Sequence, residues 1–269
     1  MRVAPSEPSA QVRPFAFRHA LEADLFAPDR LDWLCRNAPT QDLGVQYGDT
    51  GRERVGDRPE YTALRGPVLD DVRERTLQIR IFRVADWGGA AYRAARDEIL
   101  AQASPYAPDE LHFVTTMVRV FSPGCMVALH GDPDPKLVCA IDGHTTWHVR
   151  DRTAMTPLQH ERLLRGQFFL PWWDCPEEQL EIGPGDGCHV PIRWAHWLTH
   201  EGGGPAVSIE LGLWTREAVR LRKVHDVNWG MRRLHLRPSP PGGRYDPVKC
   251  RAFDAVSLVR GKGQEFRGA

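Results

Sequence analysis

Residues 127–149 read VALHGDPDPKLVCAIDGHTTWHV, and this stretch decides the fold class. Its apolar residues predict strands, and Asp142-Gly143 is typical of the tight turn between two antiparallel strands. The stretch also carries His130 and Asp132 two residues apart, a spacing that puts both side chains on one face of a strand. An imidazole beside a carboxylate is half of a metal site. The other half has to come from elsewhere in the chain.

The strand pattern continues through residues 111–215. The strand candidates are HFVTTMVRVF (112–121), CMVALHGD (125–132), KLVCAIDGHTTWHV (136–149), GQFFLP (166–171), EQLEIGPGD (178–186), GCHVPI (187–192), AHWLTHE (195–201) and PAVSIELGLWT (205–215). Gly- and Pro-containing turns separate most of them. Short strands at such close spacing predict a compact jelly-roll sandwich or barrel.

We expect four parts along the chain. Residues 1–14 form a disordered lead-in rich in Pro, Ser and Ala, and residues 15–110 form mixed α/β elements packed on the core. The jelly-roll core spans 111–215, and 216–269 form a helical C-terminal extension. No linker-like stretch separates the second part from the strands.

Local patterns predict the elements that flank the core. The first is a helix over 29–37, with Asp29 as its N-cap and Leu31, Leu34 and Cys35 at helical spacing. A strand follows over 77–84, with Leu77, Ile79, Ile81 and Arg83 on one face, and then an Ala-rich helix over 87–103. Beyond the core we expect Thr215 to cap a helix with a stripe of Val219, Val224 and Val227, followed by a polar tail that holds Lys249 and Cys250.

Composition narrows the functional classes. The 269 residues include 35 Lys+Arg and 35 Asp+Glu, a balance that argues against nucleic acid or an acidic membrane surface as the partner. No apolar signal core and no segment of membrane-spanning length is present, which predicts a soluble cytoplasmic protein. The six Cys contain no CxxC pair, and we expect Cys125 and Cys139 to be buried thiols.

A second histidine for the metal site is sought in GDGCHVPIRWAHWLTHE (185–201), which offers His189, His196 and His200. His196 is favoured, because a strand that re-enters the barrel after the Gly-Asp turn places it opposite His130. His200 is expected at a strand end near Gly202. Two histidines and one carboxylate with open positions are the ligand set suited to non-haem Fe(II).

Together these motifs resemble those of the JmjC/cupin-like Fe(II)/2-oxoglutarate-dependent oxygenases. The shared elements are His130-Gly131-Asp132, the stretch Gly143 to Trp147, and the GD…P…HW segment that ends in His196 and Trp197. The resemblance covers roughly residues 110–250 and implies a double-stranded β-helix fold. It also implies Fe(II), 2-oxoglutarate and O2 as cofactors, with His130, Asp132 and His196 as metal ligands and catalytic residues.

One position departs from the family. Where the family places a Lys or Arg for the far carboxylate of 2-oxoglutarate, this chain has Thr145, which brings no charge. Lys136 is the first candidate for the missing cation, and Arg119 the second, since Arg119 shares a strand face with Met117 and Phe121. Ser208 completes the cosubstrate-binding candidates. Arg150 and Arg193 are weaker candidates for the cation.

Other side chains are open to two interpretations. Glu210, on the last strand with Ser208, either faces solvent or lies inside with a partner such as Arg119. We interpret Trp147, Trp197 and Trp214 as packing residues, whereas Trp172-Trp173 either covers the barrel mouth or packs on the N-terminal region. His189 is a candidate for the barrel interior, and His144 and His148 are expected to be exposed or hydrogen-bonded.

The leading hypothesis is an Fe(II)/2-oxoglutarate hydroxylase that acts on an amino-acid side chain in a peptide or protein, or on a related small metabolite. The alternatives are a metal-dependent cupin enzyme that does not use 2-oxoglutarate, which Thr145 favours, and a non-catalytic ligand-binding cupin. By the same resemblance, the C-terminal extension mediates a homodimer.

Overall fold

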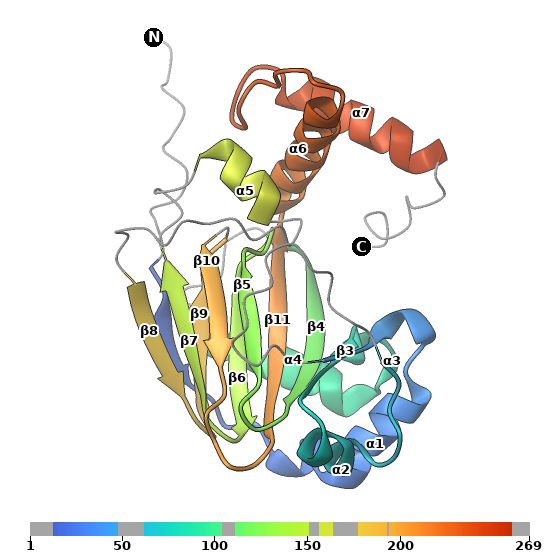
Figure 1. Cartoon of the computed structure of the whole chain (residues 1–269), viewed down its shortest axis with the longest axis vertical. Coiled ribbons are helices and arrows are strands. Elements are labelled where there is room, and N and C mark those ends of the chain that lie inside the picture. The colour runs from blue at the N-terminus through green and yellow to red at the C-terminus, as the bar shows by residue number, and fades with distance from the viewer. Residues whose placement is uncertain are drawn as a thin grey trace.

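The strands after residue 110 form two antiparallel sheets that face each other (Figure 1). The computed structural model describes residues 13–47, 62–103, 111–150, 156–163, 177–192 and 194–259. The strands are β1 (Phe15–Arg18), β2 (Leu43–Tyr47), β3 (Leu77–Phe82), β4 (Leu111–Phe121), β5 (Met126–His130), β6 (Lys136–Asp142), β7 (Thr145–Arg150), β8 (Glu177–Ile182), β9 (Asp186–Val190), β10 (Ala195–Thr199) and β11 (Ala206–Thr215). The major sheet has the order β1-β9-β6-β11-β4-β3-β2, and the minor sheet β5-β10-β7-β8.

Successive strands from β4 to β11 change sheet at nearly every step, and this winding makes a double-stranded β-helix. In the major sheet β11 lies between β4 and β6, while in the minor sheet β10 lies between β5 and β7. The predicted jelly-roll core is therefore confirmed. The predicted strand 166–171 lies outside the described residues, as do residues 1–12 of the lead-in, Trp172-Trp173, Cys175 and Arg193.

Both faces of the major sheet are buried, and the sequence of β11 shows why. Val207, Ile209 and Leu211 belong to the apolar cluster on the outer face of the sheet, whereas Ser208 and Glu210 point toward the minor sheet. Between the two sheets lies a second apolar cluster, which holds Phe121, Cys125, Val138, Ala140, Trp147, Val149, Ile182, Cys188, Val190, Trp194, Leu198 and Ala206. Polar side chains on β4 and β11 are therefore held in a mostly apolar interior.

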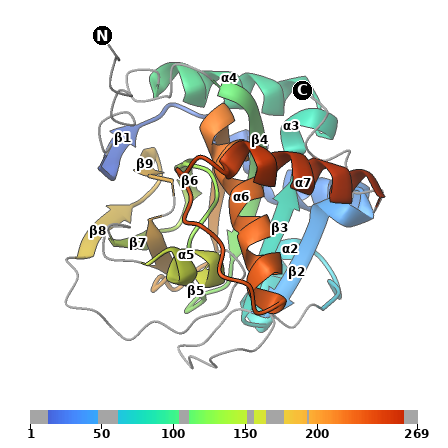
Figure 2. The ribbon, with the colours of Figure 1, turned by 90° about the horizontal axis from the view of Figure 1, so that it is seen from above.

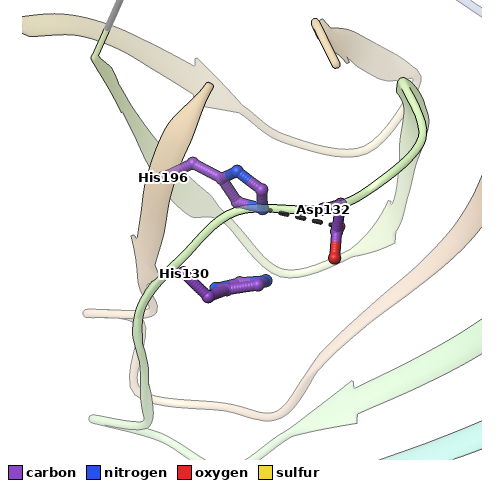
Figure 3. A group of neighbouring side chains, drawn as sticks. All are labelled: His130, Asp132 and His196. Atoms are coloured by element: carbon purple, nitrogen blue, oxygen red, sulfur yellow. Dashed lines mark ion pairs between the residues drawn. The ribbon is translucent and has the colours of Figure 1, made fainter. Parts of the chain in front are cut away.

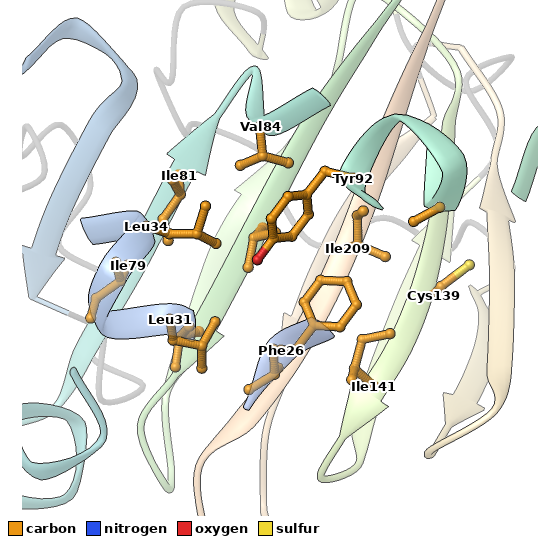
Figure 4. Packing of buried hydrophobic residues seen from close by; sticks show 14 of the residues in the cluster. Phe26, Leu31, Leu34, Ile79, Ile81, Val84, Tyr92, Cys139, Ile141 and Ile209 are labelled. Atoms are coloured by element: carbon orange, nitrogen blue, oxygen red, sulfur yellow. The ribbon is translucent and has the colours of Figure 1, made fainter. Parts of the chain in front are cut away.

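Helices from the N-terminal region cover the outer face of the major sheet (Figures 1 and 4). They are the 3-10 helices η1 (Ala23–Phe26) and η2 (Thr40–Asp42) and the α-helices α1 (Pro28–Asn37), α2 (Val68–Glu74), α3 (Val84–Trp87) and α4 (Ala90–Gln102). Because β2 and β3 extend the same sheet beyond β4, the N-terminal elements and the barrel share one hydrophobic cluster.

Two N-terminal predictions need correction in detail. Leu31, Leu34 and Cys35 are buried as predicted, but the helix begins at Pro28, because a proline suits the first helical position, and Asp29 is not its cap. Leu77, Ile79 and Ile81 are also buried, but β3 ends before Arg83. Arg83 has a left-handed backbone (φ 54°) and pairs with buried Asp42, its Nε and Nη2 each 2.7 Å from a carboxylate oxygen.

The C-terminal extension is helical, with α6 (Arg216–Arg233) followed by α7 (Asp246–Val259). Thr215 caps α6 as predicted, since its Oγ1 accepts a hydrogen bond from the Ala218 amide at 3.0 Å. Of the predicted valine stripe only Val224 is fully buried, whereas Val219 and Val227 are half-buried. The side chains that α6 buries are Ala218, Leu221, Val224, His225 and Asn228.

The predicted polar tail is wrong too, because Lys249 and Cys250 belong to α7, which packs on α6 (Figure 2). Lys249 Nζ donates to the Ser239 carbonyl at 2.6 Å, so its charge meets an acceptor in the connection between the helices. Both α6 and the short α5 (Pro157–Leu163) lie beyond one end of the barrel (Figures 1 and 2). Among the described residues, no helix has the length and apolar character needed to cross a membrane.

Candidate metal centre

Three side chains converge at the end of the barrel where β5 ends and β10 begins (Figure 3). His130 ends β5 and faces His196 of β10 directly across the sheet, with ring centroids 4.2 Å apart. A carboxylate oxygen of Asp132 lies 3.6 Å from Nε2 of His196. One ligand atom from each of the three residues lies within 4.8 Å of the others. The structure therefore brings together the three predicted ligands.

The local route to this geometry differs from the prediction. Asp132 is not on the strand with His130, because β5 ends at His130 and Asp132 lies in the following turn. The strand itself is irregular, since Val127 is opposite Leu198 and His130 is opposite His196. Between these two pairs β5 advances by three residues and β10 by only two, so β5 contains a β-bulge with one extra residue.

His196 is fixed in the form that binds a metal. It is 1% exposed, and its Nδ1 lies 2.9 Å from the Trp194 carbonyl oxygen. A carbonyl accepts but cannot donate, so Nδ1 carries the proton and Nε2 presents its lone pair toward Asp132. Such a backbone partner orients a ligand histidine and sets its tautomer.

Asp132 is held as an anion. Burial alone would raise the pKa of its carboxyl group, but nearby positive charge, that of Lys136 first, outweighs burial and holds the pKa well below its usual range. The Lys136 Nζ lies 3.7 Å from Asp132 and 2.9 Å from Asp134. Asp134 is 1% exposed, and burial raises its pKa to about 6 against the attraction of Lys136. Lys136 therefore links the metal-ligand carboxylate to a second, buried one.

Asp134 and Gly212 are site residues that the sequence analysis missed. An added Cβ at Gly212 would clash with the carboxylate of Asp134 and lie 3.2 Å from Nζ of Lys136, so a larger residue would require this pair to shift. A glycine inside an apolar strand is a signal of such close approach.

A buried ion pair lies on the inner face of the major sheet. Arg119 Nη2 donates to Glu210 Oε2 at 3.0 Å, and Arg119 Nε lies 2.9 Å from Oε1. Glu210 is 2% exposed, so the inward interpretation with Arg119 as partner is confirmed and the solvent-facing one is wrong. Ser208, 4% exposed, lies directly across from Arg119.

Thr145 lies apart from the ligands. It is the first residue of β7, and His196 pairs with Val149, four residues further along that strand. At about 3.3 Å per residue this places Thr145 roughly 13 Å along the strand from the ligands, deeper in the barrel. Thr145, Trp147 and Val149 all point inward.

The remaining candidates have structural partners. Arg150 Nη2 donates to Glu177 at 2.9 Å, and His148 hydrogen-bonds the same carboxylate at 2.8 Å, as one of its two interpretations predicted. Trp197 stacks on His148 on the outer face of the minor sheet and is only partly buried. Both ring nitrogens of His200 lie within 2.7 Å of backbone carbonyl oxygens.

His189 faces away from the barrel interior. It stacks on Phe15 of β1, with centroids 4.8 Å apart, and its neighbours Cys188 and Val190 point inward instead. Burial lowers the pKa of His189 to about 4, despite a backbone hydrogen bond with Arg13.

This histidine makes the fold acid-sensitive. In the unfolded chain His189 takes up a proton near pH 6.5, whereas in the folded chain it does so only near pH 4. Between these values the unfolded state binds more protons, so stability falls as the pH drops from 6.5 to 4, by up to ~3 kcal/mol. We expect His189→Phe to flatten this part of the stability profile, measured by urea unfolding at several pH values. An unchanged slope in the variant would assign the acid sensitivity to other groups.

Sequence comparison gives no relative, since no family model and no curated protein matches the chain. Among solved structures, the crystal structure of Escherichia coli ribosomal oxygenase YcfD is similar at a TM-score of 0.49 and 15% identity, over 92% of this chain and 63% of that chain. The YcfD complex with cobalt and 2-oxoglutarate gives 0.47 and 14%, with the same coverage. Oxalate decarboxylase from Bacillus subtilis gives 0.31 and 12%, over 59% of this chain and 32% of that one.

The chain thus spans less than two thirds of the length of the YcfD structures. At these scores the similarity adds no weight to either the fold or the activity. The strand order and the side-chain geometry of this chain show the fold and the candidate site directly: a double-stranded β-helix with two histidines and one carboxylate at one end.

Proposed function

We propose that the protein is an Fe(II)/2-oxoglutarate-dependent oxygenase that hydroxylates an amino-acid side chain in a peptide or protein, or a related small metabolite. The observation that carries this proposal is the convergence of His130, Asp132 and His196 within 4.8 Å. Two imidazoles and one carboxylate fit Fe(II), because they leave positions open for a bidentate 2-oxo acid and dioxygen. When bound, Fe(II) and 2-oxoglutarate supply the oxidising chemistry.

The chain's own residues supply orientation and exclusion of water. His130 and His196 offer imidazole lone pairs from facing strands, and Lys136 holds the Asp132 carboxylate in place. The side chains of Trp147, Val149 and Leu198 line the interior next to His196 and are almost fully buried. A dry interior strengthens every electrostatic contact within it and protects reactive species from side reactions.

A metal-dependent cupin enzyme that does not use 2-oxoglutarate is the second candidate. The observations in its favour are Thr145 and the charge balance of the interior, where Arg119 meets Glu210 and Lys136 meets Asp134. A cupin that binds a ligand without turning it over would show metal binding and no turnover.

For the partners we propose a peptide or small-molecule substrate, neither nucleic acid nor a membrane, and a cytoplasmic location. We also propose a homodimer through the C-terminal extension. Leu234 and Leu236, just after α6, are 72% and 52% exposed, and a symmetric interface would bury them.

The test is an anaerobic titration of the Fe(II)-loaded protein with 2-oxoglutarate, followed by the visible metal-to-ligand charge-transfer absorption. We expect a band that saturates, because bidentate chelation produces it, and we expect no band in His130→Ala or Asp132→Ala. Iron binding without a band would favour the second candidate.

A further inference from the structure

A groove between α5 and the C-terminal end of α6 is lined by apolar and positively charged side chains. The two helices contact each other (Figures 1 and 2), and the groove has a volume of about 710 Å³. The described residues that line it are Leu158, Arg162, Trp229, Arg232, Arg233, His235 and Leu236. None of these residues is acidic. Because the whole chain holds 35 Lys+Arg and 35 Asp+Glu, the excess of cations belongs to this place in the fold and not to the composition.

A buried ion pair makes the groove a fixed part of the fold. Arg232 Nε lies 2.6 Å from Oε2 of Glu161, which is 1% exposed, and this pair fastens α5 to α6. The carboxylate of Glu161 thus offsets the charge of Arg232. Arg162 and Arg233 are exposed, and neither has an ion pair within the described part of the chain. Two arginines, one from each helix, therefore present uncompensated charge to the groove.

The turn that ends α6 places an imidazole at the same groove. The Leu236 amide donates to the Met231 carbonyl at 3.0 Å, and the His235 amide donates to the Arg232 carbonyl at 2.9 Å. This pattern is the Schellman motif, whose left-handed position is usually a glycine. Here His235 takes that position with a φ of 60°. A side chain held in this conformation is strained, and such strain clusters where ligands bind.

The exposure of the lining favours a segment of another chain over a small molecule. Leu158, Trp229 and Arg232 are half-buried, and the other lining residues are exposed, so none of them is enclosed. A small-molecule pocket buries roughly 70–90% of its ligand, which an open groove does not do. A peptide can bind with one side in water. The half-buried indole of Trp229 and the 52% exposed Leu236 offer it apolar contact.

The small number of free charges favours carboxylates over a nucleic acid. Proteins that bind duplex DNA neutralise many phosphates, roughly six to ten in strong cases. The groove offers two uncompensated guanidinium groups, those of Arg162 and Arg233, beside the imidazole of His235. Each guanidinium matches one carboxylate in the bidentate manner. A short peptide with two carboxylates and an apolar side chain between them fits both the charge and the apolar surface.

We propose that this groove binds an acidic segment of a peptide or protein. Arg162 and Arg233 pair with two of its carboxylates, and the apolar side chain between them packs on Leu158, Trp229 and Leu236. None of the residues that line the groove is a metal ligand, so the inference does not depend on the chemistry of the metal centre.

The test titrates the metal-free full chain into two labelled peptides of about ten residues, each roughly 33 Å long when extended. One peptide alternates glutamate with leucine, and the other has glutamine in place of glutamate. Binding is followed by fluorescence anisotropy. We expect the glutamate peptide to bind about 10-fold more tightly, because only this peptide forms ion pairs with the arginines. The difference should shrink as the salt concentration is raised from about 0.1 M to about 1 M.

The variant R162Q/R233Q should bind the glutamate peptide about 10-fold more weakly and the glutamine peptide within about 2-fold of the wild type. The charge reversal R162E/R233E should instead prefer a peptide that alternates lysine with leucine. The matched control is R30Q/R93Q, which removes two exposed arginines from α1 and α4. It should bind both peptides as the wild type does. Thermal unfolding of each variant checks that it is folded.

Three results overturn the inference. The first is equal affinity for the glutamate and glutamine peptides, or wild-type affinity for the glutamate peptide in R162Q/R233Q. The second is tighter binding of a single-stranded oligonucleotide of the same length, which would assign the groove to nucleic acid. Because Leu236 also belongs to the proposed dimer surface, sedimentation velocity is recorded for each variant. Loss of self-association in R162Q/R233Q, with no peptide bound by the wild type, would assign the groove to a second copy of the chain.

All of these measurements are made without metal. Failure of the inference therefore leaves the iron titration and the proposed function untouched, and absence of the charge-transfer band leaves the peptide result untouched.

Discussion

His196→Ala is expected to remove the protein's affinity for Fe(II) and for its common substitute Co(II), and with it all metal-dependent activity. In the proposed metal centre this imidazole is one of three ligands and is oriented by the Trp194 carbonyl, so its loss leaves His130 and Asp132. Loss of a mere outer-shell partner weakens a metal site by roughly 10- to 100-fold, and loss of a ligand should exceed that range. Cobalt titration, followed by calorimetry or by visible absorption, measures the effect directly.

The control is His148→Gln. This residue lies on the outer face of the same minor sheet, immediately before Val149, which pairs with His196. We expect it to bind cobalt as the wild type does. Wild-type cobalt affinity in His196→Ala, with the fold verified by circular dichroism, would show that the metal centre lies elsewhere.

Glu210→Ala is expected to be among the most destabilising single changes in the barrel. It leaves the guanidinium of Arg119, 5% exposed, as an uncompensated buried charge. Removing one partner of a buried pair costs about 3–5 kcal/mol. In a chain of this size we expect a fall in melting temperature of roughly 10 °C, since each kcal/mol corresponds to about 2–4 °C.

The double variant R119M/E210M should recover most of that loss, because replacing both charges with apolar groups leaves nothing unpaired. Urea unfolding of the wild type, both single variants and the double variant gives the coupling free energy between the two residues. A coupling near zero would mean that water or another group compensates each charge separately.

The sequence predicted the structure correctly where the signal was local, either the alternation of side chains along one strand or a short motif. The inward and outward residues of β4 and β11 follow the period of two, and the partner of Glu210 was found because an inward carboxylate requires one. The candidate ligands His130, Asp132 and His196 were predicted from their residue types and flanking motifs, and the structure brings them together.

The predictions that were wrong depend on contacts distant in sequence. His189 lies on a strand whose two faces are both covered by apolar side chains. Alternation along the strand therefore did not show which face His189 is on, nor that it packs on Phe15 of β1. Lys249 and Cys250 seemed part of a tail because the apolar face of α7 becomes evident only against α6. The two aspartate partners of Lys136, the first candidate for the missing cation, were likewise not apparent from spacing, and its role as that cation stays a prediction.

Because of the bulge in β5, the geometry of the candidate metal centre depends on the number of residues between Val127 and His130 as well as on which residues they are. Regular alternation from inward-facing Val127 would turn the side chain of residue 130 out of the barrel. The additional residue restores the inward direction just where the ligand is needed. A deletion of one residue between Val127 and His130 would place the histidine two positions after Val127, so that regular alternation would point it inward without the bulge.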